Sequence, residues 1–290
     1  MGRICKMKKE YLVEKETTLK EFIEETWKDL SKHKRKSLLV NGVFQVNQKV
    51  QTKYNYPLKK GDMVSMKEKE IETNLDIIYE DKDIIVIDKP SGFLTISTDN
   101  RDEPTLYKEV SEYVKKQKLQ NRIFIVHRLD KDTSGVILFC KDQKLKRMFQ
   151  DHWNELVLKR EYIGIVEGSP KQKKGCVRQY LKENDAHQVY VTKNKNDGKL
   201  AITDYEVIDE MRGYSLIRFE LETGRKNQIR VACQSLGCPI VGDKKYGAET
   251  NPLKRLGLHA SKLVCVHPVT KETFEWKSQK NLSFPKKMLK

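Results

Sequence analysis

The sequence predicts a two-domain α+β protein with a largely antiparallel sheet. Helical and strand patterns follow one another without the regular strand–helix–strand alternation of a parallel sheet. The length of 290 residues suits one or two domains, each able to bury a core. A polar stretch, KEKEIETNL at 67–75, has the composition of a linker. We therefore expect a small domain over 1–70, a linker over 71–75 and a larger domain over 76–290.

The small domain is expected to begin with an amphipathic helix. Thr18-x-x-Glu21 has the form of a capping box. Apolar residues then recur at helical spacing, so the helix should run to about residue 32. The segments expected to form short strands are 43–47 and 62–66.

A basic cluster follows this helix, at Lys32, Lys34, Arg35 and Lys36. Positive side chains beside a small sheet can bind the phosphates of RNA. The alternative interpretation is a solvated helix end with no partner.

The larger domain should contain strands and helices in irregular order. The expected strands are 76–81, 84–89, 123–126, 136–140 and 161–166. The expected helices are 142–153 and 226–236. Gly237 is placed to end the second of these helices.

The charge balance favours a polyanionic partner. The chain has 57 Lys and Arg against 41 Asp and Glu, a formal net charge of +16. Basic side chains neutralise phosphates and release counterions, which favours nucleic acid. The alternative is a generic basic protein from a lysine-rich proteome.

Hydropathy and cysteine spacing exclude several classes of protein. No apolar run approaches the roughly 18–20 residues that span a bilayer. The N-terminal segment lacks the apolar core of a secretory signal, so we expect a soluble, cytoplasmic protein. The six cysteines form no Cys-x-x-Cys pair, which indicates reduced thiols and neither a disulfide framework nor a metal site.

The segment 126–138, VHRLDKDTSGVIL, places many reactive side chains between two apolar strands. Loops held between strands often carry functional groups. Asp130 and Asp132 could hold a divalent metal, but no further oxygen ligand follows at a suitable spacing. His127, Asp130 and Ser134 could suggest a hydrolase, but the Gly-x-Ser-x-Gly elbow is absent. A structural turn is the remaining alternative.

The run His-Arg-Leu-Asp-x-x-Thr-Ser-Gly at 127–135 closely resembles the signature of the RluA-type pseudouridine synthases, which isomerise uridine in RNA to its carbon-linked isomer. Further blocks typical of this family follow in the expected order over roughly residues 76–270. They are Lys89-Pro90-Ser91-Gly92, Lys159-Arg160-Glu161-Tyr162, Thr223-Gly224-Arg225-Lys226-Asn227-Gln228-Ile229-Arg230, Gly242-Asp243, Leu258-His259-Ala260 and His267-Pro268.

One position departs from the family pattern. Asn227 stands where the family usually has His. An amide can donate and accept hydrogen bonds but cannot titrate, so we assign Asn227 no proton-transfer role.

The resemblance implies a pseudouridine synthase fold with a largely antiparallel mixed sheet and flanking helices. The order helix, basic cluster, Leu-Leu-Val-Asn-Gly and Gly61-Asp62 in the small domain resembles the alpha-L RNA-binding domain. The expected partner is RNA, with large-subunit ribosomal RNA as the first candidate and transfer RNA as the alternative. Because the isomerisation adds and removes nothing, no cofactor or metal is expected, and we expect a monomer.

The resemblance carries the catalytic role over to Asp130, accompanied by Tyr162 and Arg230. A carboxylate near the anomeric carbon can attack it, stabilise its positive charge or abstract the adjacent ribose proton, and each role requires an ionised Asp130. The resemblance places Arg230 against Asp130, where its charge would oppose the pKa rise caused by burial. Tyr162 offers a ring for stacking uracil and a hydroxyl for polar contact. The resemblance also leaves open removal of the carbon 5 proton by this residue, and core packing is the structural alternative.

Further residues are expected to bind substrate: Arg128, Leu129, Arg225, Asn227, Lys89, Lys34, Arg35 and Lys36. We hypothesise that Arg128 contacts the position vacated by the flipped uridine. The residues expected to be structural are His127, His259 and His267. Two other classes remain open, a non-catalytic RNA-binding or ribosome-assembly protein of the same fold and a metal-dependent nuclease.

Overall fold

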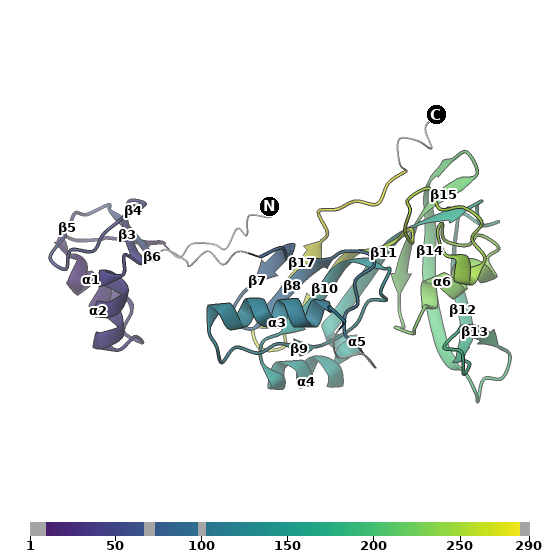
Figure 1. The fold of residues 1–290 in the computed structure, drawn as a ribbon, viewed down its shortest axis with the longest axis horizontal. Coiled ribbons are helices and arrows are strands. Elements are labelled where there is room, and N and C mark those ends of the chain that lie inside the picture. Colours follow the sequence, from purple (N-terminus) through teal and green to yellow (C-terminus); the bar gives the residue numbers. More distant parts are fainter. Residues whose placement is uncertain (1–9, 67–72, 98–102, 285–290) are drawn as a thin grey trace. The chain divides into compact units, whose positions relative to one another are not determined.

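A computed structural model describes residues 10–66, 73–97 and 103–284. Within these residues the chain forms two compact units, one over 10–66 and the other from residue 73 onward (Figure 1). Part of the predicted linker, residues 71–72, lies outside the described residues. Every described helix is too short or too polar to span a bilayer.

The small unit contains two helices where the sequence predicted one. Helix α1 spans Leu19–Thr26 and has the predicted capping box, in which the Thr18 hydroxyl accepts from the backbone of Glu21. It ends because Trp27 leaves the helical conformation and packs its ring 5.1 Å from that of Phe44. The prediction of a helix to residue 32 is therefore wrong.

The basic cluster lies on the second helix, α2 (Lys32–Val40). Ser31 caps this helix by accepting a hydrogen bond from the backbone of Lys34. Lys32, Lys34 and Lys36 are exposed. Arg35 is only half exposed, and its Nη1 donates to the carbonyl of Trp27 at 3.1 Å. This contact ties α2 to the end of α1.

Short strands complete the small unit. They are β1 (Glu10–Leu12), β2 (Thr17–Thr18), β3 (Phe44–Val46), β4 (Lys49–Val50), β5 (Pro57–Leu58) and β6 (Met63–Met66). Four of them form an antiparallel sheet in the order β1-β6-β3-β4, and β2 pairs with β5. The strands predicted at 43–47 and 62–66 are confirmed as β3 and β6. Helix and sheet share a core that includes Leu19, Ile23, Leu39, Phe44 and Val64.

The large unit is built on one extended sheet. Its strands are β7 (Ile77–Glu80), β8 (Ile84–Lys89), β9 (Phe124–Ile125), β10 (Ser134–Cys140), β11 (Val157–Glu167), β12 (Lys174–Glu183), β13 (Val189–Thr192), β14 (Lys199–Met211), β15 (Tyr214–Leu221), β16 (Leu258–Val266) and β17 (Thr273–Lys277). The order is β13-β12-β14-β15-β11-β16-β10-β8-β7, with β17 on β16 and β9 on β10. All described pairs of this sheet are antiparallel except β10 with β16. The predicted α+β class with a largely antiparallel mixed sheet is confirmed.

Helices cover the two halves of this sheet (Figure 1). They are α3 (Leu106–Gln117), α4 (Gln143–Asp151), α5 (Trp153–Leu156), α6 (Gln228–Ser235) and the 3₁₀ turn η1 (Lys244–Tyr246). Helix α4 packs Leu145 and Phe149 into a core with Leu138 of β10. Helix α6 packs Ile229 into a second core with Phe219 of β15. The predicted helix 142–153 is thus two helices, α4 and α5, and the predicted helix 226–236 is α6.

Candidate active site

The loop that leads into β10 is held by a partly buried histidine, His127. Nε2 of His127 accepts a hydrogen bond from the backbone of Leu138 at 3.1 Å, and its ring lies 5.5 Å from that of Trp153. Burial lowers the pKa of His127 to about 4, so the ring is neutral at neutral pH. A neutral acceptor in this position anchors the segment that carries Asp130.

The end of the same loop requires glycine. Gly135 has φ +116°, and a Cβ there would lie 2.1 Å from the carbonyl oxygen of Ala260. The close approach arises because β10 and β16 run parallel, with Ser134 opposite His259. The Ser134 hydroxyl lies 2.8 Å from Nδ1 of His259. The Thr-Ser-Gly and Leu-His-Ala blocks of the sequence are therefore neighbours in space.

Lys89 does not face RNA. Its side chain is fully buried, and Nζ donates to the carbonyls of Pro90, Phe93 and Lys131 at 3.0, 2.7 and 2.9 Å. Burial lowers its pKa to about 8, and Asp132 and Asp130 partly oppose that change. The prediction that Lys89 binds substrate is wrong, because the loop after β8 folds over the ammonium and uses it to hold the Asp130 loop.

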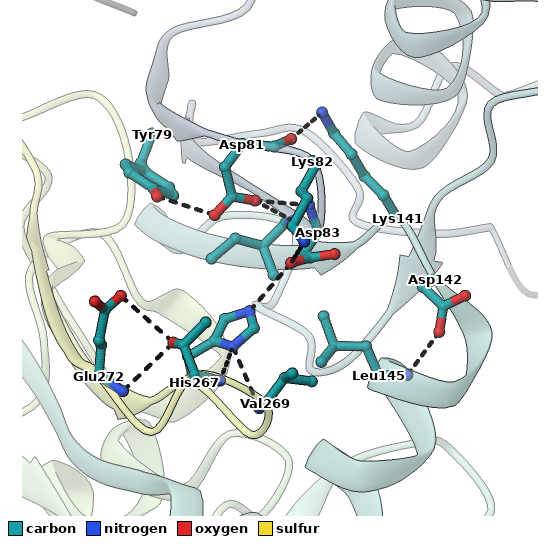
Figure 2. Close-up of polar contacts among 12 residues, drawn as sticks. Tyr79, Asp81, Lys82, Asp83, Lys141, Asp142, Leu145, His267, Val269 and Glu272 are labelled. Atoms are coloured by element: carbon teal, nitrogen blue, oxygen red, sulfur yellow. Dashed lines mark hydrogen bonds and ion pairs between the residues drawn. The ribbon is translucent and has the colours of Figure 1, made fainter. Parts of the chain in front are cut away.

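His267 lies in another part of the sheet. Nδ1 of His267 accepts from the backbone of Val269 and Thr270, and Asp83 lies 3.8 Å from its Nε2 (Figure 2). Asp83 is next to Ile84, and Ile84 pairs with Cys140. Cys140 is at the opposite end of β10 from Ser134. This cluster therefore organises a turn and lies away from Asp130.

The Thr-Gly-Arg segment is organised by Gln228. Its Oε1 accepts from the Thr223 hydroxyl at 2.8 Å and from the backbone of Arg225 at 3.0 Å. Its Nε2 donates to the carbonyl of Ile202 and to the hydroxyl of Thr203, both at 2.9 Å. Gln228 is itself buried. The loop is thereby fixed to β14, and the exposed Arg225 side chain lies at the cavity described below.

Asn227 precedes α6 in the left-handed conformation, with φ +54°. Asn and His are both enriched in this region, so the departure from the family residue preserves the backbone geometry. Its Nδ2 donates to the Tyr246 hydroxyl at 2.9 Å, and its Oδ1 accepts from Nη1 of Arg230 at 3.2 Å. Asn227 therefore links two side chains of the site.

Arg230 pairs with Asp243, which the sequence pattern contains but which was not predicted to be a site residue. Its Nε and Nη2 donate to the two oxygens of Asp243, each at 2.7 Å. Among the described residues, Asp130 receives no hydrogen bond from Arg230. The prediction that Arg230 lies directly against Asp130 is corrected to a charge that acts at longer range, because the planar guanidinium fork fits Asp243 bidentately.

One cavity of about 750 Å³ brings most of the predicted residues together. Asp130 from the loop before β10, Tyr162 from β11 and Arg230 from α6 all line it. The predicted substrate-binding residues that also line it are Arg128, Leu129, Arg225 and Asn227. Lys34, Arg35 and Lys36 belong to the small unit and are outside this lining.

Sequence reasoning missed several residues at the cavity. They are Gln150, Trp153, Asn154 and Arg160. Arg160 donates to the carbonyls of Leu221 and Glu222 and lies over the Trp153 ring at 5.8 Å. It belongs to the Lys-Arg-Glu-Tyr block, so the signal was present although only Tyr162 was selected from it.

The cavity perturbs the acids within it. Burial raises the pKa of Asp130 above its ordinary value of 3.8, and the positive charges of Arg230, Arg128 and Lys226 offset only part of that rise. Burial also raises the pKa of Tyr162 to about 12, so its hydroxyl is protonated at neutral pH. Among the described residues, no side chain donates a hydrogen bond to the Asp130 carboxylate, and the cavity also presents the exposed Glu222 and the neutral phenol of Tyr162. Over the described part of the chain, no cluster of three His, Cys, Asp or Glu could hold a metal ion.

Comparison with known proteins identifies the family. The RNA pseudouridylate synthase family matches residues 83–235. The uncharacterized RNA pseudouridine synthase YhcT of Bacillus subtilis is 34% identical over 228 residues, covering 75% of each chain. Ribosomal large subunit pseudouridine synthase D of Pasteurella multocida is 32% identical over 216 residues, covering 70% of this chain and 66% of that protein.

A solved structure shares the fold. Human RNA pseudouridylate synthase domain containing 4 matches with a TM-score of 0.59 and 23% identity, covering 73% of this chain and 90% of that one. The large unit with its extended sheet thus has the fold found in that protein. From the family match and the sequence relatives together, the chain belongs to the RNA pseudouridine synthase family of isomerases.

Proposed function

We propose that this protein isomerises specific uridines of large-subunit ribosomal RNA to pseudouridine, without a cofactor, and that Asp130 acts on a nucleotide flipped out of the RNA. The observation that carries the proposal is the meeting of Asp130, Tyr162 and Arg230, from three separate segments, at one cavity. Relatives named as large-subunit ribosomal enzymes support the choice of RNA. Transfer RNA is the alternative substrate.

The reaction conserves every atom of the nucleotide except one exchanged proton. The bond between nitrogen 1 of uracil and the anomeric carbon breaks, the base turns, and a new bond joins carbon 5 to the same sugar carbon. The proton on carbon 5 leaves to solvent, and nitrogen 1 gains one. A carboxylate in a cavity can assist by attack on the sugar carbon or by removing the adjacent ribose proton. Two carboxylates line the cavity, Asp130 and Glu222, and we assign the step to Asp130 because it belongs to the family signature and lies beside Tyr162 and Arg230 in the lining.

Tyr162 is suited to binding the base. Its raised pKa of about 12 keeps the hydroxyl protonated, so it can donate a hydrogen bond at neutral pH. Its ring lies at the cavity, where it offers a face for the extruded uracil. We assign Tyr162 to stacking and orientation of the base and not to removal of the carbon 5 proton.

The small unit is proposed to bind RNA as an alpha-L domain. Its helix α2 presents three exposed lysines, Lys32, Lys34 and Lys36, while Arg35 is tied inward to Trp27. The net charge of +16 supports binding to a polyanion. We therefore expect the three lysines to contribute more to RNA affinity than Arg35.

A tritium-release assay tests the proposed activity. The protein is incubated with ribosomal RNA that carries tritium at carbon 5 of uridine and comes from cells lacking this protein, in the presence of a metal chelator. Release of tritium to water, and its loss in Asp130→Asn, is the expected result. Binding without release would favour the non-catalytic assembly protein, and strand cleavage would favour a nuclease. Mapping the modified sites then names the uridine, and a map confined to transfer RNA would replace the ribosomal substrate.

An isotope substitution separates the two roles of Asp130. Uridine deuterated at the ribose carbon next to the anomeric carbon is compared with ordinary uridine in single turnovers. Proton abstraction predicts a slower reaction with deuterium, because the carbon–deuterium bond breaks during the step. Direct attack on the sugar carbon leaves that bond intact and predicts nearly equal rates.

A further inference from the structure

We propose that the cavity contains a second subsite, formed by Gln150, Asn154 and Arg160, which binds the base of a nucleotide next to the target uridine in the same RNA strand. The inference deepens the proposed function and rests on it for the identity of the substrate as RNA. The three residues have no part in the chemistry assigned to Asp130. The subsite therefore governs which uridine is selected and not how that uridine reacts.

The cavity is larger than one extruded base needs. Its volume is about 750 Å³, in the upper part of the range of roughly 300–1,000 Å³ found for pockets that enclose a whole drug-sized ligand. One pyrimidine ring is much smaller than such a ligand. Asp130 and Tyr162 belong to one part of the lining, and Gln150, Asn154 and Arg160 belong to another. When the target uracil lies against Tyr162, room remains for part of the neighbouring nucleotide.

Arg160 and Tyr162 follow one another along the same face of β11. Side chains of alternate residues on a strand point to the same face and lie about 6.6 Å apart along it. The pairing of β11 with β15 runs over 161–167 without a register shift, so this alternation is regular. Both side chains line the cavity. A base held at Tyr162 therefore leaves Arg160 available to the base beside it.

The Arg160 guanidinium is held in one orientation. Its Nη2 donates to the carbonyls of Leu221 and Glu222 at 3.0 and 2.8 Å. Its guanidinium carbon lies 5.8 Å from the ring centroid of Trp153, and that ring lies 5.5 Å from the ring of His127. Unpaired RNA bases stack on guanidinium planes as they do on aromatic rings. The fixed plane of Arg160 is therefore suited to hold a second base.

Gln150 and Asn154 supply hydrogen-bonding groups to the same part of the cavity. Gln150 belongs to α4, and Asn154 belongs to α5, which leads directly into β11. Both residues are exposed, and within the described ranges neither amide forms a hydrogen bond with another group of the chain. A side-chain amide offers both donors and an acceptor, the combination that complements the edge of a base. Two amides beside a guanidinium plane indicate recognition of a base.

The first test is the affinity for dinucleotides, which requires no isomerisation. The probes are the dinucleotide UpU and its two analogues in which one of the bases is absent. The parent should bind UpU about 10-fold more tightly than either analogue, because each analogue lacks the stacking of one base. When Gln150→Ala and Asn154→Ala are combined, this preference should fall at least about threefold. Equal affinities of the parent for the three probes would overturn the proposal.

The matched control is Gln143→Ala. Gln143 is exposed like Gln150 and is the first residue of the same helix, α4. It is outside the lining of the cavity. This variant should keep the full preference for UpU. A loss of preference equal to that of Gln150→Ala would overturn the assignment, because a disturbance of α4 alone would then explain both results.

Arg160→Lys separates the flat surface from the charge. Lysine remains positive and can still donate to the carbonyls of Leu221 and Glu222, but it has no guanidinium plane. The preference for UpU should again fall at least about threefold. An unchanged preference would overturn the placement of the second base on Arg160. If this variant does not fold, the combined amide variant still decides the proposal, because its substituted side chains are exposed.

Single-turnover tritium release tests the subsite in the reaction. In an RNA that contains the mapped uridine, the base on each side of it is removed in turn. One of these removals should slow the parent about 10-fold and should slow the combined amide variant much less. The acid limb of the pH–rate profile, the fall in rate toward low pH, should stay in place in this variant. A displaced limb would place the amides in the chemistry and overturn the proposal.

The two proposals can fail separately. If the parent releases no tritium but prefers UpU, and the combined amide variant loses that preference, the proposed function fails and the subsite stands as a binding site for RNA. If the parent releases tritium but binds the three probes equally, the proposed function stands and the subsite is refuted.

Discussion

Two carboxylates of the large unit, Glu80 and Asp130, have opposite surroundings. Glu80 is fully buried and accepts hydrogen bonds from Tyr113 at 2.8 Å, Gln117 at 2.7 Å and Lys141 at 2.6 Å. Burial alone would raise its pKa, but these three donors outweigh burial and lower it. Asp130 has no such donors among the described residues, and its pKa is raised.

The difference separates a carboxylate that stabilises the fold from one that is available for chemistry. Both groups lose hydration, and a buried charge is tolerated only when other interactions compensate for that loss. Glu80 is compensated by three side chains around one end of the sheet. Asp130 is compensated only by charges at longer range, which costs stability and is typical of functional sites. The comparison can be tested by removing each charge in turn.

The largest effect is expected from Asp130→Asn. Loss of the reacting carboxylate should reduce tritium release by about 10⁴-fold or more. The same change removes a desolvated charge, so the free energy of unfolding at neutral pH should stay equal or rise. Tritium release and urea unfolding measure the two quantities. A variant that is both active and less stable would show that Asp130, like Glu80, stabilises the fold and does not react.

Glu80→Gln should have the largest effect on stability. It leaves the buried Lys141 ammonium without its carboxylate, and breaking a buried pair in this way costs about 3–5 kcal/mol of unfolding free energy. Activity per folded molecule should not change. Chemical denaturation with a parallel activity assay checks both statements. If the unfolding free energy falls by less than the contribution of an exposed ion pair, the Glu80 charge is not compensated by its partners.

The two carboxylates also predict opposite pH dependences of stability. The lowered pKa of Glu80 contributes stability that is present above its unfolded value of 4.5 and is lost as the pH falls through its folded value. The raised pKa of Asp130 contributes stability that is present below its unfolded value of 3.8 and is lost as the pH rises through its folded value. Urea unfolding between about pH 3 and pH 7 should therefore show the deficit of Glu80→Gln growing with pH and the advantage of Asp130→Asn growing with pH. Parallel curves for parent and variants would contradict both assignments.

The sequence predicted the part of the site that lies in short motifs. Asp130, Tyr162 and Arg230 were selected from blocks far apart in the chain, and the structure places all three at one cavity. Such blocks can be recognised in a sequence because each lies at a strand or helix boundary. At such a boundary the local conformation permits only a few residue types. Gly135 shows this directly, since a positive φ and a close carbonyl both exclude a side chain.

The contacts between blocks could not be predicted. Asp243 was quoted in the sequence pattern, but only the tertiary fold shows that its carboxylate reaches Arg230. Lys89 was expected to bind substrate, whereas its ammonium is buried and donates to the carbonyls of Pro90, Phe93 and Lys131. The division of the first helix at Trp27 likewise depends on packing against Phe44, which the helical spacing does not contain.

The smallest expected effect concerns the cations next to the two carboxylates. Lys141 is fixed to Glu80, whereas the exposed Arg128 guanidinium has no hydrogen-bond or ion-pair partner in the part of the chain that the structure describes. Because Arg128 lines the cavity, we expect it to replace the stacking that the flipped uridine loses, a contribution of about 1–3 kcal/mol per base. Arg128→Ala should therefore slow tritium release from folded RNA by about 10-fold, and less from an unstructured strand that has no stacking to replace. Equal slowing on both substrates would instead assign Arg128 to the charge balance of Asp130, and the acid limb of the pH–rate profile would then move to higher pH.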